Sequence, residues 1–364
     1  MNVVLTFNLK PASVSSPLSS PALTISSDNT TNGTSAAAEH AHDMFAEWDE
    51  IETVRAITSA LEKAGHIVIE IEANERFPQE LLRARPDIVF NIAEGIGARS
   101  REAQIPAICE MYNIPHTGSD AVTLGICLDK SHTKEILSYY GIPTAKFLLA
   151  HSVNDANKLP FPLPVFIKPV HEGSSKGIFS TSLCRTTDGV RKEVERITST
   201  YNQPALIEEY LPGREFTVAM LGNGDSAQVL PIIEYNFSSL PGDVPKIDSF
   251  EAKWIYDRPD DPLDSLHCPA DIPEQLRKQI ETMCLRAYRA LRILDWARID
   301  VRLDANNMPH IIEINPLPGI LPRPEDNSCF PKAARTAGYS YDQLMQTVLR
   351  LAAERYGLAR TSRN

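Results

Sequence analysis

The chain has 364 residues, 43% of them apolar and 23% charged, the composition of a soluble globular protein large enough for two or three domains. Its formal net charge of −11 argues against nucleic acid or an anionic membrane as a partner, because both attract basic surfaces. Six widely spaced cysteines without a CxxC pair predict buried thiols in a reducing compartment. No apolar run nears the ~18 residues of a membrane span and no secretory pattern opens the chain, so we expect a cytoplasmic protein.

The chain opens with a predicted strand at residues 3–8. Residues 11–42 are rich in Ser, Thr, Pro, Asn and Ala and predict a mobile insertion after that strand. A helix should begin near Glu47 and end at Gly65. The apolar positions on one face of this helix are Ile51, Val54, Ile57 and Leu61.

Two short buried strands are predicted after this helix, at residues 67–71 and 87–90. Strands that alternate with helices predict a doubly wound parallel sheet for roughly the first 125 residues. Ligands of such sheets bind beyond the carboxyl ends of the strands, which is where residues 91–97 fall.

The middle part holds a Gly- and Ser-rich loop, residues 171–178, between predicted strands at 165–169 and 205–211. Backbone N–H groups of such a loop can close over phosphate oxygens, although an ordinary turn has the same composition. Lys168 lies in an otherwise apolar run, where an unpaired ammonium group is costly. It therefore needs an anionic partner, and nucleotide phosphates would serve.

Other polar residues of the middle part have more than one interpretation. Composition alone favours Lys130 as a solvated residue on the helix that follows it. Backbone groups of residues 208–211 could pair with an adenine edge, or the segment could be an interdomain connector. Glu215 could accept hydrogen bonds from ribose hydroxyls, or form a salt bridge with Arg214.

The third part predicts an antiparallel core, with a strand at residues 228–234 and a helix at 273–293. The apolar stripe of this helix is assigned to the core and consists of Leu276, Ile280, Cys284, Ala287 and Leu291. Residues 247–254 lie in a Pro- and Asp-rich region that predicts a long loop. Long loops inside compact domains are either functional or disordered.

Two alternating stretches, residues 298–303 and 310–315, predict a hairpin. If Leu303 lies opposite His310, two polar pairs face each other on one side of the hairpin. These pairs are Asp300 with Glu313 and Arg298 with Asn315. Like charges that face each other across strands are destabilising. Mg2+ would remove this cost, because it takes carboxylate, phosphate and water oxygens as ligands. The alternative is a surface hairpin with solvated acids.

Seven motifs occur in order over most of the chain from about residue 87 to 350. They are IPHTGSDAVTLGICLDK (114–130), FIKPVHEGSSKGI (166–178), IEEYLPGREFTVAML (207–221), FEAKW (250–254), ARIDVRLD (297–304), EINPLPG (313–319) and FPKAARTAG (330–338). Together they resemble the ATP-grasp superfamily, and within it the D-alanine–D-alanine ligase-like carboxylate–amine ligases.

The resemblance implies an α/β fold of three domains, α+β in its C-terminal parts. Residues 1–127 would form the substrate-side domain with the doubly wound parallel sheet, 128–220 a small central domain, and 221–364 a domain with an antiparallel core. ATP would lie between the last two domains. Two Mg2+ ions, small-molecule acid and amino acid substrates, and a homodimer through the N-terminal domain are also implied.

The resemblance assigns roles to residues on the ATP side. The metal ligands would be Asp300, Glu313 and Asn315. The ATP contacts would be Lys130, Lys168, Glu172, Ser175, Glu208, Glu209, Tyr210, Leu211 and Glu215. The catalytic groups would be Arg298 and the Gly319 N–H on the oxyanion, Lys253 on the transferred phosphate, and Ser174 in the loop over the phosphates.

The residues that would bind the first substrate depart from the family pattern. A Gly-Gly loop and a glutamate for the first amine are replaced by Phe7-Asn-Leu-Lys and the insertion. Glu47 is the nearest positional match to that glutamate, with Asp49 and Glu50 close behind. Residues 91–95 occupy the place of a His-Gly segment.

Further departures lie near the C-terminus. Trp254 stands where the family has a tyrosine after the lysine. The run after Gly319 is longer than usual and contains Arg323, which could bind an extra acidic group. Ser328 matches the serine that holds the second substrate's carboxylate.

The resemblance implies an ADP-forming ligase, in which ATP phosphorylates a carboxylate or related oxygen and an amine then displaces phosphate. Because the substrate side is altered, we expect an amino acid ligase of natural-product biosynthesis. One example would join an amino acid to a mycosporine-glycine-type ring enol or ketone, through an amide or imine bond. The alternatives are a true D-alanine–D-alanine ligase and a non-catalytic nucleotide-binding regulator, which should have lost a metal ligand or Arg298.

Overall fold

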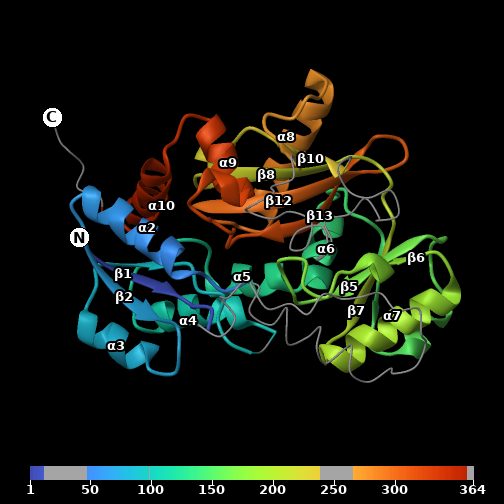
Figure 1. Cartoon of the computed structure of the whole chain (residues 1–364), viewed down its shortest axis with the longest axis horizontal. Coiled ribbons are helices and arrows are strands. Elements are labelled where there is room, and N and C mark those ends of the chain that lie inside the picture. The colour runs from blue at the N-terminus through green and yellow to red at the C-terminus, as the bar shows by residue number, and fades with distance from the viewer. Residues whose placement is uncertain (12–46, 98, 238–264, 359–364) are drawn as a thin grey trace.

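A computed structural model describes residues 1–11, 47–97, 99–237 and 265–358, which build three β-sheets with helices packed around them (Figure 1). The strand orders are β2-β1-β3, β4-β7-β5-β6 and β11-β10-β8-β12-β13, with β9 paired to β8. Within the described residues, no helix is long and apolar enough to cross a membrane. Lys253, Trp254 and residues 12–42 of the insertion lie outside the described residues.

The N-terminal sheet is parallel, as the alternating pattern predicts. Its strands are β1 (Asn2–Phe7), β2 (Ile67–Glu72) and β3 (Ile88–Asn91). Its helices are α2 (Ile51–Lys63), α3 (Phe77–Ala84) and α4 (Gln104–Met111). In Figure 1, α2 covers one face of the sheet, and α3 and α4 lie on the other.

Two local predictions for this part are wrong. The helix begins at Ile51, so Glu47 lies in the turn before α2 and not on the helix. The strand at 67–71 is not buried, because β2 lies at an open edge of the sheet and Ile67 is 65% exposed, whereas the segment at 115–117 pairs with β3 at the other edge. A short apolar run has the same composition at an edge as at the centre of a sheet, so the sequence does not separate the two.

The central sheet is antiparallel and carries α7 (Thr187–Thr200). Its strands are β4 (Phe147–Ala150), β5 (Val165–Pro169), β6 (Leu183–Cys184) and β7 (Ala205–Glu209). A separate apolar core of β5, β7 and α7 side chains holds it together, and Val165, Ile207 and Val194 belong to it. The strand predicted at 205–211 ends at Glu209, and Tyr210 and Leu211 continue into the connection.

The C-terminal sheet is the largest, and α8 (Glu274–Ala290) packs on one of its faces. Its strands are β8 (Glu215–Leu221), β9 (Gln228–Val229), β10 (Ile233–Tyr235), β11 (Leu266–His267), β12 (Trp296–Leu303) and β13 (Pro309–Asn315). The strand predicted at 228–234 is divided at Pro231, which has no N–H for a sheet ladder. Helices α9 (Cys329–Thr336) and α10 (Tyr341–Arg355) pack with α2 in the same apolar core.

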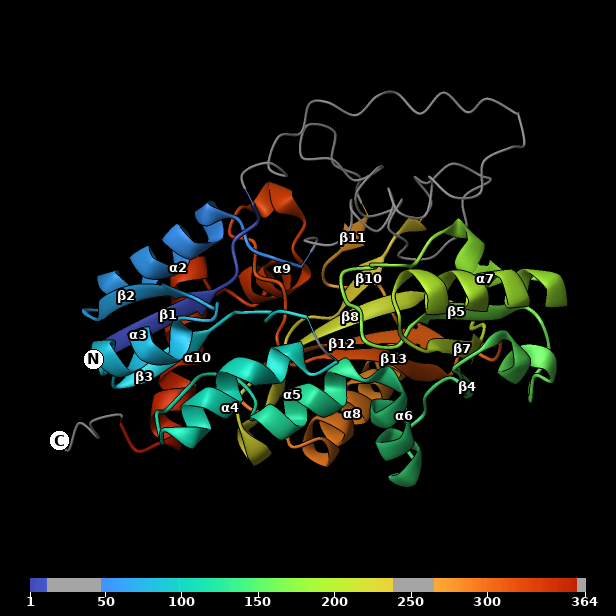
Figure 2. The same ribbon diagram turned by 90° about the horizontal axis from the view of Figure 1, so that it is seen from below.

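Helices α5 (Ala121–Leu128) and α6 (Lys130–Tyr139) lead from the N-terminal part toward the central sheet (Figure 2). Cys127 and Leu137 pack in the core of the C-terminal sheet. Strand β8 lies at the centre of that sheet, between β10 and β12. We therefore propose three domains whose second boundary falls at the Pro212–Gly213 turn and not at residue 220.

A buried carboxylate joins distant parts of this fold. Asp295 has no exposed surface and lies 2.9 Å from an Arg355 nitrogen on α10. It also accepts hydrogen bonds from the Gly118 N–H (2.8 Å) and the Asn223 side chain (2.9 Å). Three segments that are far apart in sequence therefore depend on one charge.

We expect Asp295→Ala to lower the free energy of unfolding by about 3–5 kcal/mol, because it leaves Arg355 without its buried partner. Urea unfolding followed by tryptophan fluorescence measures this change. Asp342→Ala is the control, since its pair with Lys63 is exposed and should contribute less than about 1 kcal/mol. Equal losses in the two variants would contradict the assignment.

Candidate functional site

A cavity between the central and C-terminal sheets brings together most of the residues predicted to bind ATP and metal. The predicted residues that line it are Lys168, Ser174, Ser175, Glu208, Glu209, Tyr210, Leu211, Glu215, Arg298, Asp300 and Glu313. They come from β5, β7, β8, β12, β13 and the Gly/Ser loop, 171–178. Five of these elements are strands whose positions are set by sheet pairing.

Glu208 forms the buried charge centre of the β5–β7 side. Its carboxylate lies 2.9 Å from Lys168 Nζ and 2.5 Å from Lys134 Nζ. Burial acts to raise the pKa of Glu208, but the two lysines outweigh it and lower that pKa. Lys168 does have the anionic partner that the sequence demands, and within the chain that partner is Glu208.

Lys134 was missed by the sequence analysis. It lies one helical turn after Lys130 on α6, and this spacing was the available signal. Burial lowers the pKa of Lys134, and Glu208 opposes that shift.

Lys130 is buried, so its interpretation as a solvated residue is wrong. It is 5% exposed, and its Nζ lies 3.0 Å from Glu313 Oε1 and donates to the Glu172 carbonyl oxygen. Burial acts to raise the pKa of Glu313, but Lys130 and Lys168 outweigh it and lower the pKa to about 2. The Glu313 carboxylate is therefore ionised at any physiological pH.

The β12–β13 register confirms the predicted facing pairs. Asp300 lies opposite Glu313, and Arg298 lies opposite Asn315. A β-bulge after Asp300 shifts the rest of the hairpin, so the predicted pairing of residue 303 with 310 is wrong. The residue opposite Leu303 is Pro309.

Asp300 is 7% exposed and fully engaged by neighbouring donors, so the acids are not solvated on a surface hairpin. It accepts from Thr217 Oγ1 at 2.6 Å and from two Arg298 nitrogens at 3.1 and 3.0 Å. Asn315 Nδ2 donates to it at 3.3 Å. Burial acts to lower the pKa of Arg298, but Asp300 outweighs burial and raises it.

The donors in this cleft fit magnesium. Asp300, Glu313 and Asn315 offer hard oxygen ligands on one face of the hairpin, and Mg2+ completes its shell with phosphate oxygens and water. The described residues contain no group of three or more His, Cys, Asp or Glu side chains placed to hold a metal alone. The residues present therefore suit an ion that arrives with a nucleotide.

Glu215 is paired with Arg302 of β12, and the alternative salt bridge with Arg214 is wrong. Arg214 instead pairs with Glu234 of β10 at 2.6 Å. Arg302 also donates to the Leu211 carbonyl at 2.7 Å and lies over the Tyr210 ring. The connection after β7 is thereby tied to β12.

The Gly/Ser loop is held by charged contacts of Glu172. Its carboxylate lies 2.9 Å from Lys176 Nζ and accepts from Gln203 Nε2 at 2.7 Å. Ser174 and Ser175 both have positive φ, 50° and 60°, and the Lys176 N–H donates to the Gly173 carbonyl at 2.9 Å, so the two serines form the centre of a tight turn.

Glu47 reaches this loop from the N-terminal part. Arg101 donates to both Glu47 carboxylate oxygens at 2.8 Å, and a Cβ added to Gly173 would lie 2.4 Å from Glu47 Oε1. Arg101 was missed by the sequence analysis, because no local pattern links residues 54 positions apart. Asp49 pairs with the chain just after β1: its N–H donates to the Asn8 carbonyl, and its carbonyl accepts from the Lys10 N–H, each at 2.9 Å.

Burial raises the pKa of Asp49 to about 8 and that of Glu102 to about 7. Burial and the neighbouring Glu102 and Glu47 also raise the pKa of Glu94. Asn8 Oδ1 accepts from the Gly95 N–H at 2.8 Å and so holds the turn that carries Glu94. The sequence predicts that ligands bind at this segment, 91–97, beyond the end of a strand, but it does not predict the buried acids.

The predicted residues after β13 are close to one another. Ser328 Oγ donates to the Gly319 carbonyl and accepts from the Leu321 N–H, each at 3.2 Å. Arg323 is paired with Asp326 at 2.9 Å and is exposed.

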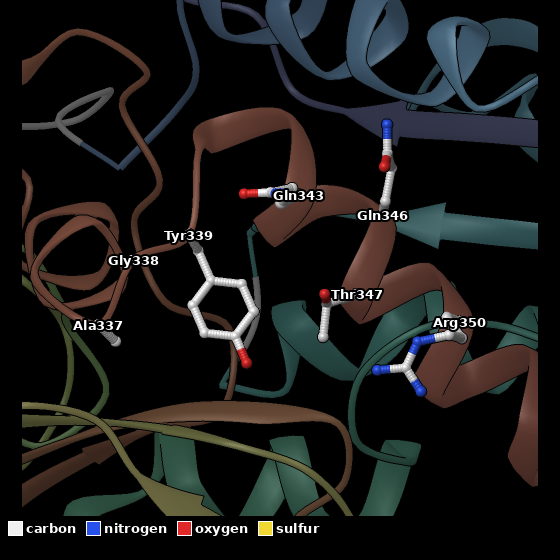
Figure 3. Close-up of a pocket in the computed structure, with 7 residues that line it drawn as sticks. All are labelled: Ala337, Gly338, Tyr339, Gln343, Gln346, Thr347 and Arg350. Carbon is white, nitrogen blue, oxygen red and sulfur yellow. The ribbon is translucent and has the colours of Figure 1, made fainter.

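A second hollow lies between the α9–α10 turn and α10 (Figure 3). Tyr339, Thr347 and Arg350 face it, while Gln346 donates to the Ala60 carbonyl at 2.8 Å. None of the described residues that line it is a carboxylate, so the lining offers no acidic ligand for a metal ion.

Comparisons with known proteins agree with this geometry. A family model described as D-ala D-ala ligase C-terminus matches residues 136–350. An uncharacterized protein, y4sG, of Sinorhizobium fredii is 33% identical over 85% of this chain and 90% of its own length. The D-alanine–D-alanine ligase of Bordetella avium is 33% identical over 70% of this chain and 74% of its own.

Solved structures show the same fold. The D-alanine–D-alanine ligase of Bacillus anthracis matches with a TM-score of 0.66 and 20% identity, over 98% of this chain and 99% of its own. The same enzyme complexed with ATP matches with a TM-score of 0.64 and 19% identity, over the same shares of the two chains.

We expect Asp300→Asn to abolish the gain in ATP affinity that Mg2+ provides, a loss of at least ~10-fold, because one of two metal carboxylates is gone. Isothermal titration calorimetry with ATP, with and without Mg2+, measures it. Thr217→Val is the control, since it removes a hydrogen bond to Asp300 but keeps the charge. A full Mg2+ effect in Asp300→Asn would remove the metal assignment.

Glu102 makes stability depend on pH, because its raised pKa favours the folded state while the carboxyl is protonated. This contribution is complete below its ordinary pKa and is lost as pH rises through about 7. We expect Glu102→Gln to reduce the fall in the free energy of unfolding between pH 5 and 8 by about 1–3 kcal/mol. Urea unfolding at both pH values measures it, and exposed Glu62→Gln is the control. An unchanged fall would contradict the prediction.

Proposed function

Because the chain belongs to the D-alanine–D-alanine ligase family of ATP-grasp enzymes and is an ATP-dependent, ADP-forming carboxylate–amine ligase, we propose that its natural substrates differ from two D-alanines. It would join the amino group of an amino acid to a small acid, or to a related keto or enol oxygen, in natural-product biosynthesis. The observation that carries this proposal is the Arg101–Glu47 pair, since Glu47 is the nearest match to the family's amine-binding glutamate.

Other residues of the same region support an altered substrate. Glu94 replaces the histidine of the family's His-Gly segment, and Glu102 lies beside Arg101. Burial holds the pKa of both carboxyls above the ordinary range. A substrate that carries a cationic group would relieve this unfavourable burial of acids.

The proposed mechanism uses the charges of the cleft in two steps. In the first, an oxygen of the acid attacks the γ-phosphorus of ATP, ADP leaves, and an acyl phosphate forms. In the second, the amine attacks the acyl carbon, phosphate leaves, and the amine loses a proton. Bound Mg2+ would neutralise phosphate charge during transfer. Arg298 and the Gly319 N–H would stabilise the oxyanion of the second step.

The paired charges suit this sequence of events. Lys130 with Glu313 and Lys168 with Glu208 form ion pairs that neutralise each other in the cleft. When a triphosphate enters, both lysines can turn to phosphate oxygens, and Glu313 can turn to the metal. The adenine would lie against residues 208–211 and the ribose against Glu215. Ser174, Ser175 and Glu172 would cover the phosphates.

The substrate side keeps several assignments as proposals. Ser328 would hold the second substrate's carboxylate. Arg323 would bind an acidic group only after release from Asp326. Asp49 is a second candidate for the substrate amine. Lys253, for the transferred phosphate, and Trp254 complete the proposed set. We also propose two Mg2+ ions and a homodimer.

A second function is favoured by the relatives, several of which are D-alanine–D-alanine ligases at 30–33% identity. Phosphate release from ATP and Mg2+ should separate the candidates when D- and L-amino acids are offered alone and with small acids or ketones. We expect release only with an added acid or ketone. Release with D-alanine alone would favour the cell-wall reaction. Bound ATP without release under any condition would favour a regulator.

A further inference from the structure

A buried arginine connects the N-terminal part to the Gly/Ser loop. Arg101 is 8% exposed, and its Nη2 donates to both Glu47 carboxylate oxygens at 2.8 Å. Its Nη1 donates to the His171 carbonyl at 2.7 Å. One rigid guanidinium therefore ties the turn before α2 to the first residue of the loop, and neither can move away without breaking charged hydrogen bonds.

The loop also contacts Glu47 directly. An added Cβ at Gly173 would lie 2.4 Å from Glu47 Oε1, which is closer than real Cβ contacts allow. The carboxylate therefore rests against the loop backbone, and a side chain at position 173 would displace it. Arg101 contacts the loop at His171 and Glu47 contacts it at Gly173. The residue between them, Glu172, is held through its carbonyl, which accepts a hydrogen bond from Lys130 on α6.

The loop has a further anchor at the same place. His171 Nε2 lies 3.1 Å from Asp129 Oδ2, and the Gln203 side chain accepts from the His171 N–H at 2.8 Å. These contacts reach the loop from α6 and from the segment before β7. Arg101 is the contact that reaches it from the substrate side.

Arg101 stays charged in this environment. Burial acts to lower its pKa, but Glu47, Glu102, Glu172 and Glu94 outweigh burial and raise it. An arginine surrounded by acids cannot be replaced by lysine without loss, because lysine lacks the planar fork that serves Glu47 and His171 together.

We propose that Arg101 is a positioning residue that holds the Gly/Ser loop closed over bound ATP, through Glu47 on one side and the His171 carbonyl on the other. The inference rests on the proposed function only in taking Mg-ATP as the ligand of the cleft. A loop held in this way excludes water from the reacting phosphate. The exclusion matters because water would hydrolyse the acyl phosphate before the amine attacks it.

Hydrogen exchange of residues 171–178, followed by mass spectrometry with Mg2+ and a non-hydrolysable ATP analogue, tests the proposal. With the analogue bound, exchange in this loop should be about 10-fold or more faster in Arg101→Met than in the wild type, and intermediate in Arg101→Lys. Gly173→Ala should give faster exchange with Arg101 intact, because the new Cβ displaces Glu47. Unchanged loop exchange in Arg101→Met with the analogue bound would overturn the proposal.

Arg214→Met is a matched control. Arg214 also donates to both oxygens of one carboxylate, Glu234, and to one carbonyl, Asp271, but it does not contact the loop. Its replacement should leave loop exchange unchanged. If β1 and β12 lose protection together with the loop in Arg101→Lys, Arg101 supports the whole fold and the proposal is wrong. Failure of the wild type to bind the analogue would contradict the proposed function as well.

Discussion

The structure depends on the neutralisation of two carboxylates that face each other across a strand pair. Asp300 and Glu313 lie opposite each other on β12 and β13, an arrangement that is unfavourable when the charges are uncompensated. Arg298 compensates the first from the same strand, and Lys130 compensates the second from the start of α6. Because this lysine comes from another element, the ion pair ties α6 to the hairpin, together with the packing of Leu137 in the core of the C-terminal sheet.

Buried charges are also neutralised on the β5–β7 side, but there the positive charges are in excess. One acid, Glu208, lies between two lysines, Lys134 and Lys168. The hairpin carries buried Asp300 and half-buried Glu313, and two buried lysines lie beside Glu208, so each of these charges has a partner in the cleft. A triphosphate with a divalent cation brings both signs of charge. It can therefore enter by exchange of partners, without leaving a buried charge uncompensated.

Whether the sequence predicts the contacts of a side chain depends on how far away in the sequence its partners lie. The Asp300–Glu313 pair was predictable because alternation within one hairpin determines which side chains share a face. The bulge after Asp300 was not, because it changes the backbone and leaves the pattern of residue types intact. Arg101 and Lys134 were missed because their carboxylate partners lie 54 and 74 positions away, Glu47 before Arg101 and Glu208 after Lys134. The predicted boundary at residue 220 leaves β8 with the central domain, because a mainly apolar strand fits the centre of either sheet, whereas in the structure β8 pairs with β10 and β12.

The two sides of the proposed site differ in how they are built. Several residues proposed to bind ATP and metal, among them Lys168, Glu208 and Asp300, lie on paired strands, so sheet register holds them in place. Glu47 lies in the turn before α2, Glu94 follows β3, and Arg101 begins a short 3-10 helix (Arg101–Ala103). All three lie outside the sheets, so side-chain contacts hold them in position. The Arg101–Glu47 pair therefore ties the N-terminal part to the Gly/Ser loop without disturbing a sheet. In the proposed function, a change in this pair would act on the loop that covers the phosphates as well as on the site of the substrate amine.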